Sequence, residues 1–262
     1  MRAVSVHPDV IVLTSRVWQT TCTIVRGGDE AFVIDSLVYP DELELLPAIL
    51  QQAGFRFTGL LATHGDWDHL LGRLAFPDAA LGVSETTAAR LRGTPAEAQR
   101  ELRDFDDQHY VVRPRPLALG QIEALPVPGF CGLGDREMEL HPADGHTDDG
   151  MAVFAEWAGV LICGDYVSPV EIPIIRGSPT AYLATLGRLG QLVERAEWVI
   201  PGHGEPLGRV RAGEIVRDHV DYVEAMIADP LAVRPAFARG RPAQRRLHAE
   251  NVERLVGRRE GS

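Results

Sequence analysis

Polar and apolar positions alternate with a period of two early in the chain, a pattern that is typical of β-strands. Residues 10–15 (VIVLTS) and 20–36 (TTCTIVRGGDEAFVIDS) are rich in β-branched side chains, and Gly27 and Gly28 interrupt the second segment. We therefore predict a strand followed by a hairpin that turns at the two glycines. Residues 59–63 (GLLAT) add a short apolar strand.

Six segments instead have the residue pattern of helices. The first has acidic residues in its first turn, Leu43 and Leu46 at helical spacing, and Gly54 at its end. The next two open at Ser84 and Thr94, which are suited to capping a helix. The predicted helices are residues 40–54, 84–91, 94–108, 178–196, 212–230 and 241–259.

Short strands broken by proline and glycine return in the middle of the chain. The predicted strands here are residues 110–114, 123–129, 136–143, 150–156 and 159–165, and residues 197–202 follow later. Two strand-rich stretches, each followed by helices, predict an α/β protein in which two sheets pack together with helices outside.

Length and charge narrow the class of protein. The chain has 262 residues, of which 45% are hydrophobic. We expect one domain over residues 1–262 that ends in a helical, arginine-rich segment from about residue 230. The 26 basic and 37 acidic residues give a net charge of −11, which disfavours a nucleic-acid or membrane partner. A small-molecule substrate is compatible with this charge.

Targeting and redox signals predict a cytoplasmic location. Residues 1–15 lack the basic region and the continuous apolar core of a signal peptide, and no apolar run approaches the ~18 residues of a membrane span. Cys22, Cys131 and Cys163 are odd in number and lack CxxC spacing, so we expect neither disulfides nor a thiolate zinc site. The sequence leaves open whether the chain forms homo-oligomers.

Seven side chains of metal-ligand type occupy polar turns that follow apolar strands. They lie in THGDWDH, ADGHTDDG, LICGDY and IPGHGEP, and they are His64, Asp66, Asp68, His69, His146, Asp165 and His203. Imidazole and carboxylate groups bind Zn²⁺, Mn²⁺ and Fe²⁺, and seven of them suit two neighbouring ions that share a bridging carboxylate. Alternate residues of an extended loop point the same way, so His64 and Asp66 can reach one ion while Asp68 turns toward another.

A solvated loop is the alternative for each of these turns taken alone, because a single His-x-Asp pair is usually surface. Four such turns in order favour a metal site over coincidence. The other histidines lack this setting, and we interpret them as surface or structural residues: His7, His109, His141, His219 and His248.

The motifs resemble those of the metallo-β-lactamase superfamily, whose members share an αββα sandwich of two mixed sheets. HGDWDH is similar to the family's HxHxDH motif, GHT to its third histidine, ICGD to its bridging aspartate and PGHG to its last histidine. The resemblance implies one metal held by His64, Asp66 and His146. It implies a second metal held by Asp68, His69 and His203, with Asp165 as the bridge.

Members of this superfamily typically hydrolyse esters, thioesters, lactones, amides or phosphodiesters. The resemblance implies that a metal-bound hydroxide attacks the substrate while the metal polarises the bond that is broken. Asp68 is the expected catalytic residue, which orients that hydroxide and carries a proton to the leaving group. We therefore expect a metal-dependent hydrolase of a small ester-like substrate.

Asp66 departs from the family pattern, which has a second histidine at this position. A carboxylate adds negative charge and a hard oxygen, which favours Mn²⁺ or Fe²⁺ more than an all-histidine set would. We expect two divalent ions, zinc by default, with manganese or iron as alternatives. Two histidines and one carboxylate also admit an iron-dependent oxygenase resembling persulfide dioxygenases. A non-catalytic binding protein on the same fold is the third alternative.

Several neighbouring residues have two interpretations each. Thr147 and Tyr166 follow two of the ligands, where they either support a ligand or oxyanion or serve capping and packing. Trp67 forms a pocket wall or a buried anchor, and residues 167–177 (VSPVEIPIIRG) line a pocket or cover a sheet edge. The basic residues of the ending form a solvated helix face or bind an anionic partner. They are Arg239, Arg241, Arg245, Arg246, Arg254, Arg258 and Arg259.

Overall fold

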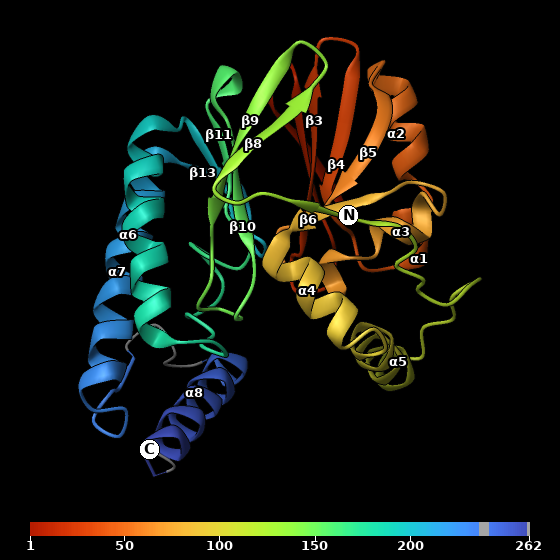
Figure 1. Ribbon diagram of the computed structural model, residues 1–262. Helices are drawn as coiled ribbons and strands as arrows, with labels where there is room; N and C mark the ends of the chain where they lie inside the picture. The colour runs from red at the N-terminus through yellow and green to blue at the C-terminus, as the bar shows by residue number, and fades with distance from the viewer. Residues whose placement is uncertain (236–240, 261–262) are drawn as a thin grey trace.

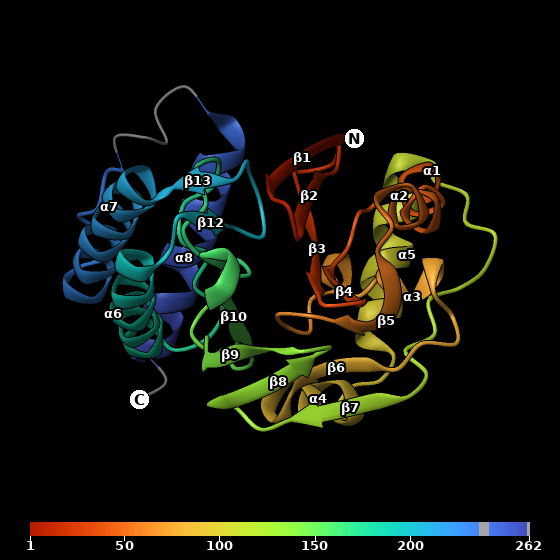
Figure 2. The ribbon, with the colours of Figure 1, turned by 90° about the horizontal axis from the view of Figure 1, so that it is seen from above.

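Two mixed β-sheets pack face to face, and helices cover their outer faces (Figures 1 and 2). The computed structural model describes residues 1–235 and 241–260, and in the second range it describes side chains up to residue 257. The observed arrangement is an αββα sandwich, which confirms the predicted fold class.

The first sheet contains seven strands within the described residues, in the order β1-β2-β3-β4-β5-β6-β7. Strands β1 to β4 pair antiparallel, and β4 to β7 pair parallel. The strands are β1 Arg2–His7, β2 Val10–Thr14, β3 Thr21–Gly27, β4 Glu30–Asp35, β5 Arg56–Leu61, β6 Leu81–Ser84 and β7 Ile122–Leu125.

The second sheet has six strands in the described part of the chain, in the order β13-β12-β11-β10-β9-β8. Only β11 and β12 pair parallel among these described neighbours, and the other pairs are antiparallel. The strands are β8 Gly129–Leu133, β9 Arg136–Pro142, β10 Met151–Ala155, β11 Val160–Ile162, β12 Trp198–Ile200 and β13 Leu207–Gly208.

Helices α1 to α5 lie beside the first sheet, and α6 to α8 lie on the side of the second (Figure 1). None of the described helices is long and apolar enough to cross a membrane. The helices are α1 Pro40–Leu43, α2 Leu46–Ala53, α3 Gly72–Ala75, α4 Glu85–Gly93, α5 Glu97–His109, α6 Pro179–Arg195, α7 Arg209–Ala228 and α8 Pro242–Glu260, with 3₁₀ turns η1 Trp67–His69 and η2 Glu156–Ala158.

Both faces of the central strands are buried, because each sheet has the other sheet on one face and helices on the other. In β10, Met151 and Val153 belong to the core between the sheets, whereas Ala152 and Phe154 belong to the core that includes α6 and α7. This alternation explains why the strands are apolar at successive positions.

The prediction of one continuous helix at residues 40–54 is wrong, because the segment forms two helices, α1 and α2. Pro47 has no N–H to donate to the carbonyl of Leu43, and its ring would collide with that carbonyl in a continuous helix. Gly54 ends α2 as predicted, with a φ of 70° that a residue without Cβ adopts freely.

The strand predicted at residues 110–114 is also wrong, because this segment is irregular. Tyr110 ends α5 with a left-handed φ of 54°. Arg113 then turns back to donate two hydrogen bonds of 2.8 and 2.9 Å to the carboxylate of Asp106. Pro114 of this segment has no N–H to offer to a neighbouring strand.

The segment predicted as one strand at residues 123–129 connects the two sheets. β7 closes the first sheet, Pro126 and Pro128 interrupt the pairing, and β8 begins the second sheet at Gly129. Strands β1, β6, β8 and β13 were not predicted. The hairpin of β3 and β4 is confirmed, with its turn at Gly28.

The carboxyl ends of four strands meet at one edge of the sandwich. β4 and β5 run parallel in the first sheet, and β11 and β12 run parallel in the second. The loops that leave such strand ends are where α/β proteins place functional side chains.

Candidate metal centre

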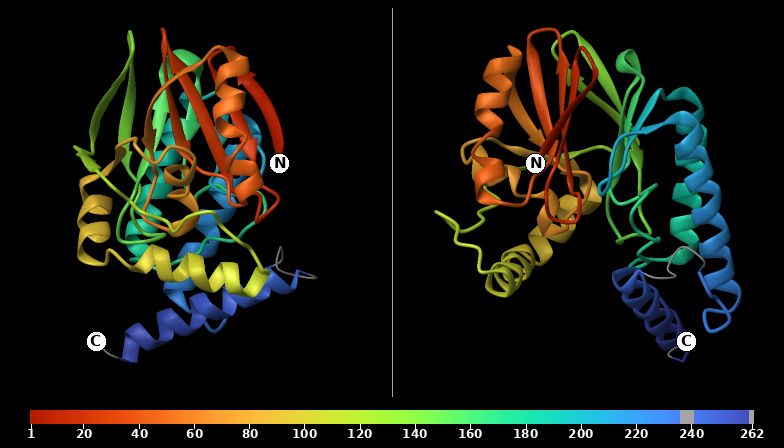
Figure 3. Two further views of the ribbon diagram at one scale, coloured as in Figure 1. Left: turned by 90° about the vertical axis from the view of Figure 1, so that its right-hand side faces the viewer. Right: turned by 180° about the vertical axis from the view of Figure 1, so that it is seen from behind.

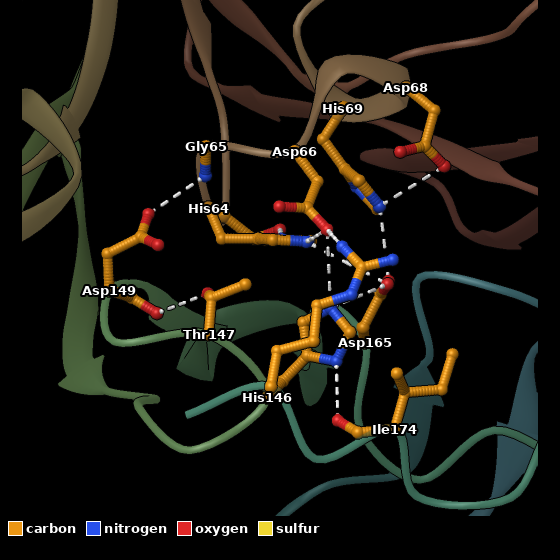
Figure 4. A network of polar contacts seen from close by, with 12 residues as sticks. His64, Gly65, Asp66, Asp68, His69, His146, Thr147, Asp149, Asp165 and Ile174 are labelled. Carbon is orange, nitrogen blue, oxygen red and sulfur yellow. Dashed lines mark hydrogen bonds and ion pairs between the residues drawn. The ribbon is translucent and has the colours of Figure 1, made fainter. Parts of the chain in front are cut away.

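Each predicted ligand lies on a loop at this shared edge. Residues 64–69 follow β5 and include η1, Asp165 follows β11, and His203 follows β12. His146 lies in the loop that connects β9 to β10. The structure brings all seven side chains together, and Figure 4 shows six of them converging.

His64, Asp66 and His146 form a first group that could hold a metal ion. The Nε2 atoms of His64 and His146 lie 3.7 and 3.5 Å from Oδ2 of Asp66. Ligand atoms that surround a tetrahedral ion at about 2.1 Å are about 3.4 Å apart, so these separations suit a metal.

Asp68, His69 and His203 form a second group with similar dimensions. Oδ2 of Asp68 lies 3.7 Å from Nε2 of His69 and 3.5 Å from Nε2 of His203. All three side chains are buried.

Asp165 lies between the two groups and presents a different oxygen to each. Its Oδ2 lies 3.7 Å from Nε2 of His64 and 3.4 Å from Nε2 of His146. Its Oδ1 lies 3.1 Å from Nε2 of His69 and 3.4 Å from Nε2 of His203. One carboxylate therefore contacts both groups.

Gly202 makes room for this carboxylate. A Cβ at position 202 would overlap Oδ1 of Asp165 and the backbone of Gly164. The glycine of the PGHG motif is therefore needed for the close approach of two loops, one from β11 and one from β12.

The second ring nitrogen of His146 and of His203 is held by a backbone carbonyl. Nδ1 of His146 lies 2.9 Å from the carbonyl oxygen of Ile174, and Nδ1 of His203 lies 3.2 Å from that of Trp18. A carbonyl accepts only from Nδ1–H, which leaves Nε2 as the lone-pair nitrogen that faces the centre.

His64 and His69 are oriented by Thr63 and Asp35. Nδ1 of His64 lies 3.1 Å from Oγ1 of Thr63, and Nδ1 of His69 lies 3.2 Å from Oδ2 of Asp35. Asp35 also accepts the backbone N–H of Thr63 at 2.7 Å. This aspartate was not predicted, although AFVIDS shows the same signal as the ligands, a polar side chain directly after an apolar strand.

The unpartnered nitrogens of the site fit a metal ion. Nε2 of His64, His69 and His146 is buried and forms no well-aligned hydrogen bond among the described residues, although carboxylate oxygens lie 3.1 to 3.7 Å away. These side chains are only 1% to 4% exposed. Burying an imidazole nitrogen without a partner is costly, and a divalent cation supplies that partner.

The charges of the site also call for a cation. Burial alone would raise the pKa of Asp165, but His203, His69 and His64 hold it well below its usual value. Burial alone would lower the pKa of His203, but Asp165 and Glu171 raise it to about 10. The carboxylates therefore attract positive charge to the centre, as protons or as metal.

Two arginines balance the extra carboxylate at Asp66. Nη1 of Arg90 lies 2.9 Å from Oδ1 of Asp66, and Nη1 of Arg176 lies 2.5 Å from Oδ2. Arg90 also contacts Oδ1 of Asp149 at 2.9 Å, while Oδ2 of Asp149 accepts the backbone N–H of Gly65 at 2.9 Å. The motif ADGHTDDG contains Asp149, but the pattern gave no reason to select it.

Thr147 and Tyr166 both hold the backbone near His146. The Tyr166 hydroxyl accepts the N–H of His146 at 2.8 Å and donates to the carbonyl of Ala143 at 3.3 Å. Oγ1 of Thr147 donates to the carbonyl of Asp149 at 3.1 Å. These contacts fit support of a ligand loop.

Trp67 is buried, with its ring centroid 5.7 Å from that of Trp18 and 4.9 Å from that of Phe105. These packing contacts fit the interpretation of Trp67 as an anchor for the ligand loop.

Residues 167–177 lie against α8, and Arg176 near the end of this segment lines a groove. Ile172 and Ile175 are buried in a core cluster that includes Leu255 of α8. Among the predicted basic residues of the ending, Arg239 and the side chains of Arg258 and Arg259 lie outside the described part of the chain.

The sandwich and the converging ligands define a metal-binding αββα protein. The family model of the metallo-beta-lactamase superfamily matches residues 15–203, and the chain belongs to that superfamily. No curated protein matches the sequence. Membership supports a metal-dependent hydrolase in general.

Solved structures with the same fold include three with distant sequences. A metallo-beta-lactamase family protein from Thermus thermophilus is 22% identical, with 98% of this chain and 95% of that chain covered and a TM-score of 0.68. A beta-lactamase domain protein from Burkholderia ambifaria is 20% identical, with 87% and 77% covered and a TM-score of 0.64. The inverting sec-alkylsulfatase Pisa1 from Pseudomonas sp. is 15% identical, with 87% and 42% covered and a TM-score of 0.66.

Proposed function

We propose that the protein is a metal-dependent hydrolase of a small ester-like substrate and that its seven converging side chains hold two divalent ions. The observation that carries this proposal is the position of Asp165, whose two oxygens lie 3.1 to 3.7 Å from histidines of two different groups. A carboxylate shared by two ligand sets is the arrangement of a two-metal hydrolytic site.

Each side chain has a role in this proposal. His64, Asp66 and His146 hold one ion, Asp68, His69 and His203 hold the other, and Asp165 bridges them. Bound divalent ions lower the pKa of water and polarise the bond that is broken. Asp68, whose side chain lies within the buried site, is the residue that would carry a proton to the leaving group.

Zinc is the default metal, and Asp66 makes manganese or iron an alternative. Arg90 and Arg176 share the negative charge of Asp66, which weakens the preference for harder ions that a bare carboxylate would give. Arg90 and Arg176, which contact Asp66, line a groove of about 570 Å³, a size that suits a small-molecule substrate. We also propose a cytoplasmic location, which cell fractionation tests.

Metal content tests the site itself. We expect protein purified without chelators to contain close to two equivalents of Zn²⁺, Mn²⁺ or Fe²⁺ by mass spectrometry. A small fraction of one equivalent, with no gain after adding each of the three metals, would refute the proposal.

Activity tests the reaction. We expect metal-loaded protein to cleave at least one class in a panel of carboxylic esters, thioesters, lactones, phosphodiesters and sulfate esters. Asp68→Ala should reduce that rate by about 10²- to 10⁴-fold, the range of acid–base catalysis. Asp41→Ala, an exposed aspartate, is the control and should keep full activity. An unchanged rate in Asp68→Ala would remove the role given to Asp68.

An iron-dependent oxygenase is the second candidate, because His64, Asp66 and His146 form a two-histidine, one-carboxylate group. The intact second group counts against it, since that chemistry uses a single iron. Oxygen uptake by iron-loaded protein with thiol-derived substrates, without hydrolysis in the panel, would favour the oxygenase. Metal binding without either reaction would favour a non-catalytic binding protein.

A further inference from the structure

The groove beside the metal centre is built by elements from both halves of the fold. Its lining includes Arg90 of α4, Glu101 of α5, Thr147, Arg176 and Arg254 of α8. Helices α5 and α8 lie on the two sides of the same end of the sandwich, as Figures 1 and 3 show. The carboxy-terminal helix is therefore part of the groove.

Two buried amides of α8 fasten this helix to the segment that precedes Arg176. Asn251, which is fully buried, accepts the N–H of Ile175 at 2.9 Å and donates to the carbonyl of Pro173 at 2.7 Å. Gln244 accepts the N–H of Ile172 at 2.7 Å. The carbonyl of Ile174, between these anchored residues, contacts His146. The position of α8 is thus fixed relative to the metal centre.

Arg254 extends from the same face of α8 as Asn251, because residues three apart lie side by side on a helix. Its Nη1 atom is buried and makes no hydrogen bond among the described residues. No described carboxylate lies within ion-pair distance of it. Arg254 lines the groove, where its positive charge, which no described carboxylate pairs with, would attract an anionic ligand.

The other arginines near the groove are differently placed. Arg90 and Arg176 line it as well, but both contact Asp66. Arg246 of α8 is 77% exposed, and its Nε lies 3.8 Å from Oε1 of Glu250. Unlike Arg246, Arg254 therefore faces the groove and lacks a described partner.

We propose that Arg254 binds an anionic group of the substrate, at a distance from the bond that is broken. A carboxylate, a sulfate and a phosphate all present the oxygen pair that a guanidinium fork recognises. This inference rests on the proposed hydrolase and makes its substrate class more specific: small esters that carry a second, negatively charged group. The arginine-rich ending then contributes one arginine to the substrate site.

Matched ester pairs test the role of Arg254 in catalysis. The probes are the 4-nitrophenyl ester of glutaric acid, with a free carboxylate, and the same ester with that carboxylate capped as a methyl ester. We expect Arg254→Gln to raise KM about tenfold or more for the charged ester and to leave the capped ester unchanged. Arg254→Lys should recover part of the loss, and the control Arg246→Gln should change neither ester. Equal effects of Arg254→Gln on both esters, or no effect, would overturn the proposal.

Anion binding can be measured without ester hydrolysis, so it tests the role of Arg254 separately from the proposed hydrolase activity. Calorimetric titration of the full-length protein, as purified, with glutarate, sulfate and phosphate compares the three anions. At least one should bind to wild type and to Arg246→Gln, and its affinity should fall about tenfold or more in Arg254→Gln. If no ester is cleaved but this difference is observed, the hydrolase proposal fails and the anion site stands. If no anion binds, or if Arg254→Gln binds equally well, the anion site is refuted whatever the outcome of the ester assays.

Discussion

The carboxylate of Asp35 lies 3.2 Å from Nδ1 of His69, on the side of the imidazole ring away from the other ligands. Both side chains are at most 2% exposed. Asp35 ends β4 with a φ of 59°, a left-handed conformation that glycine, asparagine and aspartate adopt more readily than other residues. This left-handed turn aims the carboxylate at His69 and at the backbone of Thr63.

Replacing this carboxylate should weaken metal binding. Asp35→Asn keeps the size and tolerates the left-handed turn, but it removes the charge that makes His69 a better ligand. Such partners of metal-bound histidines typically contribute 10- to 100-fold in affinity, and we expect a loss in that range by competition with a chelator. Asp41→Asn, at an exposed aspartate, is the control. An unchanged metal affinity in Asp35→Asn would contradict the proposed orientation of His69.

The ligand loops could be predicted from the sequence because each carries its own local signal. THGDWDH and LICGDY place ligand-type side chains directly after apolar strands, and parallel strands bring such loops to one edge. Asp35 carries the same signal and was overlooked because it stands alone in its turn. Arg90 gives no local signal, since an arginine on a helix is usually solvated, and only the packing of α4 brings it to Asp66.

The boundaries of the helices and strands depend on prolines and on buried polar contacts, which the pattern of hydrophobic positions does not reveal. Pro47 divides a segment whose apolar spacing is continuous, and Pro126 and Pro128 divide a strand between two sheets. The docking of α8 depends on Asn251, a polar residue that no apolar periodicity would place in a core.

Asp66→His should change the choice of metal. The substitution restores the residue type of the family motif and removes a hard oxygen ligand, so Zn²⁺ should be retained better than Mn²⁺ or Fe²⁺. Arg90 and Arg176 would lose their shared partner, and we expect a loss of about 2 kcal/mol in the free energy of unfolding. Metal content after growth in defined media and thermal unfolding measure the two effects. Asp66→Glu, which keeps the charge, should retain the wild-type metal ratio. The same metal ratio in Asp66→His would exclude Asp66 as the determinant.

Asn251→Ala should destabilise both the fold and the first ligand group. It leaves the N–H of Ile175 and the carbonyl of Pro173 without their partners, which costs about 3 kcal/mol when both are buried. Because Ile174 between them orients His146, we also expect weaker metal binding. Denaturant unfolding and chelator competition are the measurements, with Glu253→Ala on the exposed face of α8 as the control. Full stability of Asn251→Ala would mean that α8 is not held by this amide.

His219 of α7 should make stability depend on pH. Burial lowers its pKa to about 4, against an opposing hydrogen bond to the backbone of Glu171.

An unfolded histidine has a pKa near 6.5, so below that pH the unfolded chain binds a proton that the folded chain refuses. The free energy of unfolding should therefore fall as the pH drops from about 6.5 to about 4. This single group accounts for roughly 2 kcal/mol of the fall by pH 5. Urea unfolding at pH 7 and pH 5 should show this extra loss in wild type and in the control His7→Gln but not in His219→Gln. Parallel losses in all three proteins would show that His219 is not buried in its neutral form.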